Sequence, residues 1–217
     1  MIVDLNLQGK KIIIVGGGNE AQKRINSVIK QGCHITVISD SVNSQINKLS
    51  KAKKITLRKQ KISDTKFLSK LKPDLVITTT DNKKINQKII NDAKKKRIIA
   101  YSSDNPDESD FSNPAIINFE NMIQIAIFTG GKSPAMSNKI KDRSEELFKK
   151  IISKEDIAQI KIQKKAREMA KEMIATQEQR RECLHSIIND NEIDQLIKDG
   201  QVKKAEKQAI TILRNWK

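Results

Sequence analysis

The sequence predicts an α/β fold in which a parallel sheet covered by helices is followed by a hairpin and a helical region. Three observations lead to this prediction. Short β-branched runs alternate with helical stretches over the first hundred residues, a glycine-rich turn joins the first run to the first helix, and helical periods dominate after Pro134. A core of Ile, Leu, Val and Ala, with only 3% aromatic residues, suits such a sheet.

The first forty residues predict a β-α-β unit of the Rossmann type. Residues 11–15 are a β-branched run, and residues 20–31 place Ala21, Ile25 and Val28 on one helix face before Gly32 ends the helix. Residues 34–38 are again strand-like. Because a helix of this length connects strands in a right-handed crossover, the two strands are expected to be parallel.

The same alternation continues to residue 101. It predicts helices over 41–50, 64–71 and 83–95 and strands over 55–59, 75–79 and 98–101. The pattern breaks at 102–114, a segment with two prolines and four acidic residues. In sheets of this kind, a loop that follows a strand at the carboxyl edge is where ligands bind.

Beyond this loop the chain predicts a hairpin and then helices. Residues 115–119 and 122–128 are strand-like and are joined by the short turn Glu120-Asn121, so they are expected to be antiparallel. Ser133 is a good N-cap and Pro134 a good first helical residue. Amphipathic periods then predict helices over 134–152, 155–176, 179–189, 192–198 and 202–216.

The net charge of +16, from 42 Lys and Arg against 26 Asp and Glu, is expected to attract anions. The alternative is that most lysines simply solvate helix faces. We expect no nucleic-acid partner, because single-strand binders stack bases on exposed aromatic rings, which are scarce here. Every apolar run is too short to span a bilayer and no signal peptide is evident. We therefore expect a cytoplasmic protein with no membrane partner, in which Cys33 and Cys183 are reduced.

The turn Gly16-Gly17-Gly18-Asn19-Glu20-Ala21 carries the pattern Gly-x-Gly-x-x-Ala between a strand and a helix. Gly16 allows the tight turn, Gly18 lets a pyrophosphate approach the backbone, and Ala21 lets the helix pack closely on the strand. The free N–H groups at the helix N-terminus favour phosphate. The turn therefore predicts a dinucleotide site, against the alternative of a merely structural turn.

An acidic residue follows the second predicted strand. Asp40, nineteen residues after Ala21, can accept hydrogen bonds from ribose hydroxyls and repel a 2′-phosphate, which favours NAD over NADP. Ser39 is a second candidate for contact with the ribose. Asp40 can instead cap a helix that begins at Ser41, and both interpretations remain open.

The segment 78–82 closes the fourth predicted strand with hydroxyl, carboxyl and amide side chains. Thr79, Thr80 and Asp81 are candidates to line the cofactor. The segment can also cap the helix that begins at Lys83, and the two roles are compatible.

Proton transfer, if this chain catalyses it, falls to a carboxylate or hydroxyl. His34 and His185 have no partner at metal-ligand spacing, so no metal site is expected. Asp104, directly after the fifth predicted strand, is the best placed base, although an Asp before Asn-Pro often only forms a turn. Gly131-Lys132-Ser133 is not a Walker A loop, because Ala126 stands where that motif needs Gly.

Several segments together match a known family. They are Leu7–Lys11 leading into the glycine turn, Thr79–Asn82 with Asn86, Asp104, Asp110-Phe111 with Pro114-Ala115, Thr129–Pro134, and Glu178–Arg181. On these segments the chain resembles the precorrin-2 dehydrogenase / sirohydrochlorin ferrochelatase family, the N-terminal module of sirohaem synthases. The resemblance covers essentially the whole chain, and Asp-Phe-x-x-Pro-Ala and Thr-Gly-Gly-x-Ser-Pro are its most specific parts.

The resemblance implies NAD-dependent oxidation of precorrin-2 to sirohydrochlorin, with Asp104 as the catalytic general base. It also implies a homodimer with an NAD-binding Rossmann domain over 1–113, a dimerisation region over 114–152 and a helical C-terminal domain over 153–217. A basic cleft is expected to hold the substrate's carboxylates, with Lys139 and Arg143 among the candidate cations. The substrate-binding candidates are Thr129, Gly130, Gly131, Lys132, Ser133, Arg180 and Arg181.

The chain departs from the family pattern at two points. Tyr101-Ser102-Ser103 precedes Asp104 where the family has Asn-Val-x, and Thr129 stands where some relatives carry Ser. Some members also insert Fe²⁺ into sirohydrochlorin, so a bifunctional enzyme is an alternative. No methyltransferase module follows, so the complete sirohaem synthase activity is not expected. A non-enzymatic NAD-sensing regulatory domain shares the glycine turn and is the remaining alternative.

Overall fold

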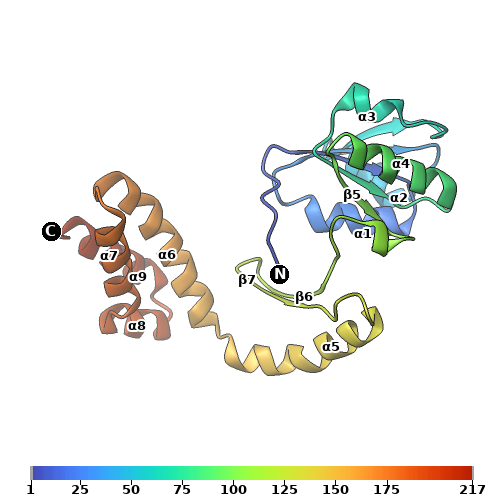
Figure 1. Ribbon diagram of the computed structural model, residues 1–217. Coiled ribbons are helices and arrows are strands. Elements are labelled where there is room, and N and C mark those ends of the chain that lie inside the picture. Colours follow the sequence, from blue (N-terminus) through green and yellow to red (C-terminus); the bar gives the residue numbers. More distant parts are fainter. Residues whose placement is uncertain (1, 217) are drawn as a thin grey trace. The chain divides into compact units, whose positions relative to one another are not determined.

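The computed structural model describes residues 2–216, and the chain divides into two compact units, Met1–Asn113 and Pro114–Lys217 (Figure 1). Each unit has buried core residues of its own. The proposed division of labour between a dimerisation region and a helical domain stays a prediction. None of the helices between residues 2 and 216 is both long and apolar enough to cross a membrane.

The first unit is a five-stranded sheet in the order β3-β2-β1-β4-β5. All four strand pairs are parallel, which confirms the predicted Rossmann-type sheet. The order reverses at β1 and β4, and ligands bind beside this reversal in such sheets. The strands are β1 (Lys11–Val15), β2 (His34–Ser39), β3 (Thr56–Lys59), β4 (Leu75–Thr78) and β5 (Ile99–Ser102).

Helices cover both faces of this sheet. α1 (Asn19–Val28) and α2 (Ser44–Lys51) pack on the face that carries Ile12 and Ile14. α3 (Lys66–Leu71) and α4 (Lys83–Lys95) pack on the face that carries Ile13 and Val15. Alternate residues of β1 therefore enter opposite cores, which explains why its apolar run is continuous.

In the first unit, two predicted helix ends differ from the structure by three residues. α2 begins at Ser44 instead of residue 41, because the Asn43 side chain accepts a hydrogen bond from Ile46 N (2.9 Å) and caps the helix. The interpretation of Asp40 as a cap for a helix beginning at Ser41 is therefore wrong. α1 ends at Val28 instead of residue 31, because Gln31 N bonds the Val28 carbonyl (2.9 Å) in a tighter turn.

The second unit begins with the predicted antiparallel hairpin, β6 (Ala115–Phe119) and β7 (Ile123–Ile127). Three residues, Glu120 to Met122, lie between the paired Phe119 and Ile123. Glu120 and Asn121 have left-handed backbones, with φ of 51° and 58°, and Met122 N donates to the Phe119 carbonyl (2.8 Å), as in a turn of type I′. α5 (Pro134–Ile151) follows, and the Ser133 side chain caps it by accepting a hydrogen bond from Met136 N (3.2 Å). That predicted cap is confirmed.

Four further helices complete the second unit. The predicted helix over 155–176 ends earlier, at Met173, because the Thr176 hydroxyl caps the next helix by accepting from Gln179 N (3.2 Å). The helices surround a core that includes Ile162 and Ile187. They are α6 (Lys154–Met173), α7 (Gln177–Ile188), α8 (Asn191–Lys198) and α9 (Val202–Arg214).

Candidate active site

Polar loops meet at the carboxyl edge of the parallel sheet. The loops after β1, β2, β4 and β5 all leave this edge because the four strands run in the same direction. The structure thus brings the glycine turn, Ser39–Asp40, the segment 79–81 and Asp104 to one edge of the first unit. The predicted residues Thr129–Ser133, Arg180 and Arg181 belong to the second unit.

The three glycines of the turn have different roles. Gly16 has a φ of +119°, and a Cβ there would collide with Thr79. Gly17 packs so closely on the Ser41 carbonyl that a Cβ would overlap it. A Cβ on Gly18 would meet no atom within 4 Å, so the space beside this residue is open. Gly16 and Gly17 therefore build the turn, while Gly18 leaves room for a ligand. The role of Gly17 has no counterpart in the sequence-based prediction.

Hydrogen bonds connect the glycine turn to β2 and the loop after it on one side, and to the loop after β4 on the other. Gly16 N donates to the Ile38 carbonyl (3.0 Å), and Asn43 N donates to the Gly17 carbonyl (2.9 Å). From the other side, the Thr79 hydroxyl donates to the Val15 carbonyl (3.0 Å). The turn is therefore fixed to the loops that follow β2 and β4.

The N-terminus of α1 is arranged to receive an anion. Gly18 is its N-cap residue, is exposed, and provides no side chain to cap the helix. The first N–H groups, beginning with those of Asn19 and Glu20, thus lack the partner that a capping side chain supplies elsewhere in this chain. Residues 16–21 fit the phosphate groups of a dinucleotide on these grounds.

A carboxylate within the first turn of α1 works against anion binding unless it is neutralised. Glu20 forms ion pairs with Arg24 and with Lys23 (3.4 Å). The Arg24 guanidinium also lies 4.9 Å from the centroid of the Tyr101 ring in β5. Arg24 therefore both neutralises Glu20 and packs the helix start against the sheet.

The residues that follow β2 differ in accessibility. Asp40 is exposed, and its Oδ1 accepts a hydrogen bond from Ser41 N (2.9 Å), which orients the carboxylate at the strand end. Ser39 is buried, and its hydroxyl donates to the Ser41 carbonyl (2.6 Å). Asp40 is therefore accessible to a ribose, whereas the Ser39 proton is already engaged in the turn.

Asp104 belongs to a hydrogen-bonded network centred on Asn86. Its Oδ1 accepts hydrogen bonds from Asn86 Nδ2 (3.0 Å) and from the Ser102 hydroxyl (2.5 Å). The Asn86 amide also donates to the Thr80 carbonyl (2.7 Å) and accepts from the Thr80 hydroxyl (2.6 Å). The buried hydroxyls of Ser102 and Thr78 lie 3.0 Å apart. This network fixes the orientation of the Asp104 carboxylate.

Asn86 is a candidate site residue to which the sequence-based prediction assigned no role. It is only 1% exposed and lies on the apolar face of α4, between Ile85 and Ile89. A buried amide needs hydrogen-bond partners, and the Asp104 and Thr80 side chains supply them. The signal in the sequence is a polar residue on an otherwise apolar helix face. Thr80 therefore bonds the Asn86 amide, while the Asn82 side chain caps α4 by accepting a hydrogen bond from Ile85 N (3.1 Å).

The loop that carries Asp104 is fastened back onto β5. Ser102 N donates to the Ser109 hydroxyl (2.9 Å), and Ala100 N donates to Asp110 Oδ2 (2.8 Å). The Phe111 ring stacks on Tyr101 with centroids 5.1 Å apart. These contacts on the far side of the loop restrict the positions that Asp104 can take.

The predicted substrate ligands in the second unit are partly engaged in local structure. The Thr129 hydroxyl donates to the Ser133 carbonyl (3.0 Å) and accepts from Ser133 N (3.1 Å). Arg180 donates to the Ile174 carbonyl (3.1 Å). Gly130, Gly131, Lys132 and Arg181 are among the remaining candidates. The role of all these residues as substrate ligands stays a prediction.

Comparisons with known proteins identify relatives of this arrangement. A family described as putative NAD(P)-binding matches residues 3–115. The chain is 27% identical to a siroheme synthase of Psychromonas ingrahamii over 199 residues, covering 92% of this chain and 40% of that protein. A siroheme synthase of Nitrosospira multiformis is 28% identical over 148 residues, which cover 66% of this chain and 30% of that protein. The resemblance expected from the sequence is confirmed.

A solved structure shares the fold over nearly the whole chain. SirC, precorrin-2 dehydrogenase, superposes with a TM-score of 0.69 at 20% sequence identity, covering 96% of this chain and 99% of that one. The match shows a common fold. The chain spans less than half the length of the siroheme synthases described above.

Proposed function

The chain belongs to the family described as putative NAD(P)-binding, and on that premise we propose that it is an NAD-dependent precorrin-2 dehydrogenase that forms sirohydrochlorin. The observation that carries the proposal is Asp104, an oriented carboxylate at the same sheet edge as the glycine turn. Similarity to siroheme synthases supports the tetrapyrrole substrate. A reducing, cytoplasmic location accords with two cysteines that are both free thiols.

The first unit offers the groups that would hold the dinucleotide. The free N–H groups at the start of α1, beginning with those of Asn19 and Glu20, would bind the pyrophosphate, and Asp40 would accept hydrogen bonds from the adenosine ribose. The exposed Asp40 carboxylate would repel a 2′-phosphate, which supports NAD over NADP. Thr79, Thr80 and Asp81 would line the remaining part of the site. When bound, the nicotinamide supplies the acceptor for the hydride that leaves the substrate.

Asp104 would take the proton that the oxidation releases. Loss of a hydride from precorrin-2 leaves a cationic ring, and a proton must then leave to give sirohydrochlorin. The hydrogen bonds from Asn86 and Ser102 both end on Asp104 Oδ1, so Oδ2 is the oxygen presented for the proton. Asn86 acts here as a positioning residue.

The basic surface would hold the substrate's carboxylates. The chain carries a net charge of +16, and Lys132 and Arg181 are exposed cations in the second unit. Charge-assisted hydrogen bonds from such side chains are the strongest ligands for carboxylates. We therefore retain the segment 129–133, Arg180 and Arg181 as the proposed substrate-binding residues.

A homodimer formed through residues 114–152 is also part of the proposal. This region carries a group of large apolar side chains that are 37–61% exposed: Ile116, Met122, Phe128, Met136, Leu147 and Ile151. A two-stranded hairpin is marginal by itself and gains stability when its apolar side chains are covered. A second copy of this region would cover them.

The test is anaerobic turnover of precorrin-2 with NAD⁺, followed by the absorbance of NADH and sirohydrochlorin. Asp104→Asn is expected to lower kcat by about 10³-fold while dinucleotide affinity stays within about twofold of the parent. Asp107→Asn, an exposed carboxylate in the same loop, is the matched control and should keep full activity. No turnover by a preparation that binds NAD would refute the dehydrogenase. Full activity in Asp104→Asn would refute the assigned base.

The same protein preparation tests two alternatives, a bifunctional enzyme that also inserts iron and a non-enzymatic NAD-sensing domain. Iron insertion is measured separately, by adding Fe²⁺ to sirohydrochlorin and following sirohaem. Equal rates in the parent and in Asp104→Asn would exclude a base shared by the two reactions. NAD binding without any affinity for tetrapyrroles would instead favour a regulatory domain.

A further inference from the structure

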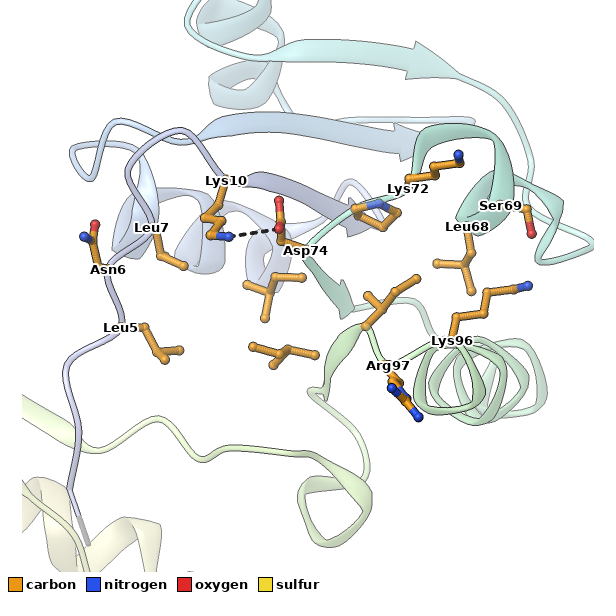
Figure 2. Close-up of a pocket in the computed structure, with 14 residues that line it drawn as sticks. Leu5, Asn6, Leu7, Lys10, Leu68, Ser69, Lys72, Asp74, Lys96 and Arg97 are labelled. Carbon is orange, nitrogen blue, oxygen red and sulfur yellow. Dashed lines mark hydrogen bonds and ion pairs between the residues drawn. The ribbon is translucent and has the colours of Figure 1, made fainter.

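A cleft of about 750 Å³ opens at the amino edge of the parallel sheet, the edge opposite the candidate active site. It lies between the N-terminal segment, the end of α3 and the turn that enters β5 (Figure 2). Lys10, Asp74 and Ile98 immediately precede β1, β4 and β5, which locates the cleft at the strand starts. Its volume falls within the range of small-molecule sites.

The floor of the cleft is apolar. It is formed by Leu5, Leu7, Leu68, Leu75, Ile98 and Ile99. Two of these side chains are unusually accessible for large apolar groups, with Leu5 37% and Ile99 41% exposed. Apolar surface gathered in a concave site marks a place where a ligand gains free energy by excluding water.

The rim of the cleft carries excess positive charge. Lys10 is paired with Asp74 Oδ1 (3.2 Å), and Asp74 Oδ2 accepts a hydrogen bond from Lys11 N (2.8 Å). Both oxygens of the carboxylate that lines the cleft are thus engaged. Over residues 2–216, no ion pair involves Lys72, Lys96 or Arg97, which Figure 2 shows around the side formed by α3 and the turn into β5.

Helix geometry explains only part of this arrangement. Lys72 follows α3 and Lys96 follows α4, and cations at helix C-termini interact favourably with the helix dipole. The dipole accounts for the cations but not for the exposed Leu5 and Ile99 beside them. Cations around an apolar floor are complementary to a ligand that combines an apolar body with an acidic head.

We propose that this cleft is a second ligand site, separate from the dinucleotide site, that binds an amphipathic carboxylate. The apolar body would lie against Leu5 and Ile99, and the carboxylate would face Lys72, Lys96 and Arg97. The proposal does not depend on the dehydrogenase activity, because the cleft and the glycine turn lie at opposite ends of the same strands.

The experiment uses the full chain and the probe dodecanoate, with binding followed by calorimetry. The triple variant K72Q/K96Q/R97Q and the single variant Ile99→Glu are each expected to weaken dodecanoate binding at least about tenfold. Lys53→Gln and Ile188→Glu are the matched controls, because Lys53 and Ile188 are also exposed but do not line the cleft. Circular dichroism checks that every variant is folded.

Competition distinguishes this cleft from the dinucleotide site. Saturating NAD should leave dodecanoate binding unchanged, and dodecyltrimethylammonium should bind at least about tenfold more weakly than dodecanoate. Displacement by NAD would show that the ligand uses the dinucleotide site and would overturn the proposal. Absence of dodecanoate binding, or equal binding by the parent and Ile99→Glu, would also overturn it.

Discussion

The parallel sheet of the first unit and the hairpin of the second unit are both rich in isoleucine, yet they bury very different shares of it. Every residue of β4 is buried, whereas Ile117 is the one buried residue among the ten of β6 and β7. Helices cover both faces of the parallel sheet, while the hairpin packs against α5. Burial therefore follows from the elements that cover a strand, and similar compositions lead to a closed core or to an open surface.

Equivalent core and hairpin substitutions test this difference most strongly. Ile14→Ala should lower the free energy of unfolding by about 3 to 4 kcal/mol at every protein concentration, because the fully buried side chain would leave a cavity. Ile116→Ala should cost less than about 0.5 kcal/mol in dilute solution, since this side chain is 40% exposed. Urea denaturation at several protein concentrations measures both. Equal losses at all concentrations would contradict the comparison.

Charged substitutions on α5 test whether a second copy of the chain covers the exposed apolar side chains of the second unit. Leu147 and Ile151 are 58% and 61% exposed, so aspartate at both positions should leave the first unit's melting temperature unchanged. If a second copy covers them, the double variant should raise the dimer dissociation constant by about 30-fold, or about 2 kcal/mol. Sedimentation equilibrium provides the measurement. Met173→Asp is the control, because Met173 is similarly exposed on α6. An unchanged dissociation constant in the double variant would place the interface elsewhere.

The two units also differ in how exposed their ion pairs are. In the first unit, Arg24 is 18% exposed beside Glu20, whereas on α5 Lys149 is 51% exposed beside Glu146. Arg24→Met should weaken NAD binding about tenfold, because the Glu20 carboxylate would then oppose the pyrophosphate at the start of α1. Adding Glu20→Gln should restore the affinity, and Lys149→Met should not change it. Calorimetric titration with NAD tests all three, and a loss that persists in the double variant would show that the Glu20 charge is not its cause.

The smallest expected effect concerns Asp74. A hydrogen bond from Lys11 N, and then the neighbouring Lys10, lower the pKa of this carboxyl. The ionised carboxylate therefore contributes stability that is present above the unfolded pKa of about 3.9 and is lost as the pH falls through the lower folded pKa. Because the side chain is 42% exposed, Asp74→Asn should cost less than about 1 kcal/mol at pH 7.

Thermal melts of the parent and Asp74→Asn across pH 3 to 7 check this prediction. The difference in melting temperature should shrink as the pH falls, because the parent also loses its charge there. Glu146 on α5 provides the contrast: the neighbouring Lys149 lowers the pKa of its carboxyl, but the side chain is 76% exposed, so Glu146→Gln should not alter the melts. A difference for Asp74→Asn that persists undiminished at pH 3 would mean that the carboxylate charge is not its source.

The parallel sheet and the succession of strands and helices along the chain were predictable, because strand and helix periods are local properties of the sequence. β1 and α4 have the predicted bounds. Helix ends were less predictable, since they depend on which of several nearby side chains accepts the capping hydrogen bond. Asn43 and Thr176 do so here, and each shortens a predicted helix.

The candidate site was predictable only as a set of strand-end positions. The glycine turn, Asp40 and Asp104 are visible in the sequence because each closely follows a predicted strand. The link from Asn86 to Asp104 is not, because the partners are eighteen residues apart and meet only when α4 packs beside β5. Helix and strand periods give no information about which residues of the second unit contact a substrate, so those candidates depend on the family resemblance alone.

The packing of Gly17 against the Ser41 carbonyl has a consequence for protein engineering. The turn and the entry to α2 interlock, and Asn43 N bonds the Gly17 carbonyl as well. A graft of residues 16–21 alone into another Rossmann-type scaffold would place Gly17 against a foreign loop with a different backbone path. A transplanted segment therefore needs at least residues 11–43, which carry the turn together with the loop after β2, and the host scaffold has to supply the contact that Thr79 makes with Val15.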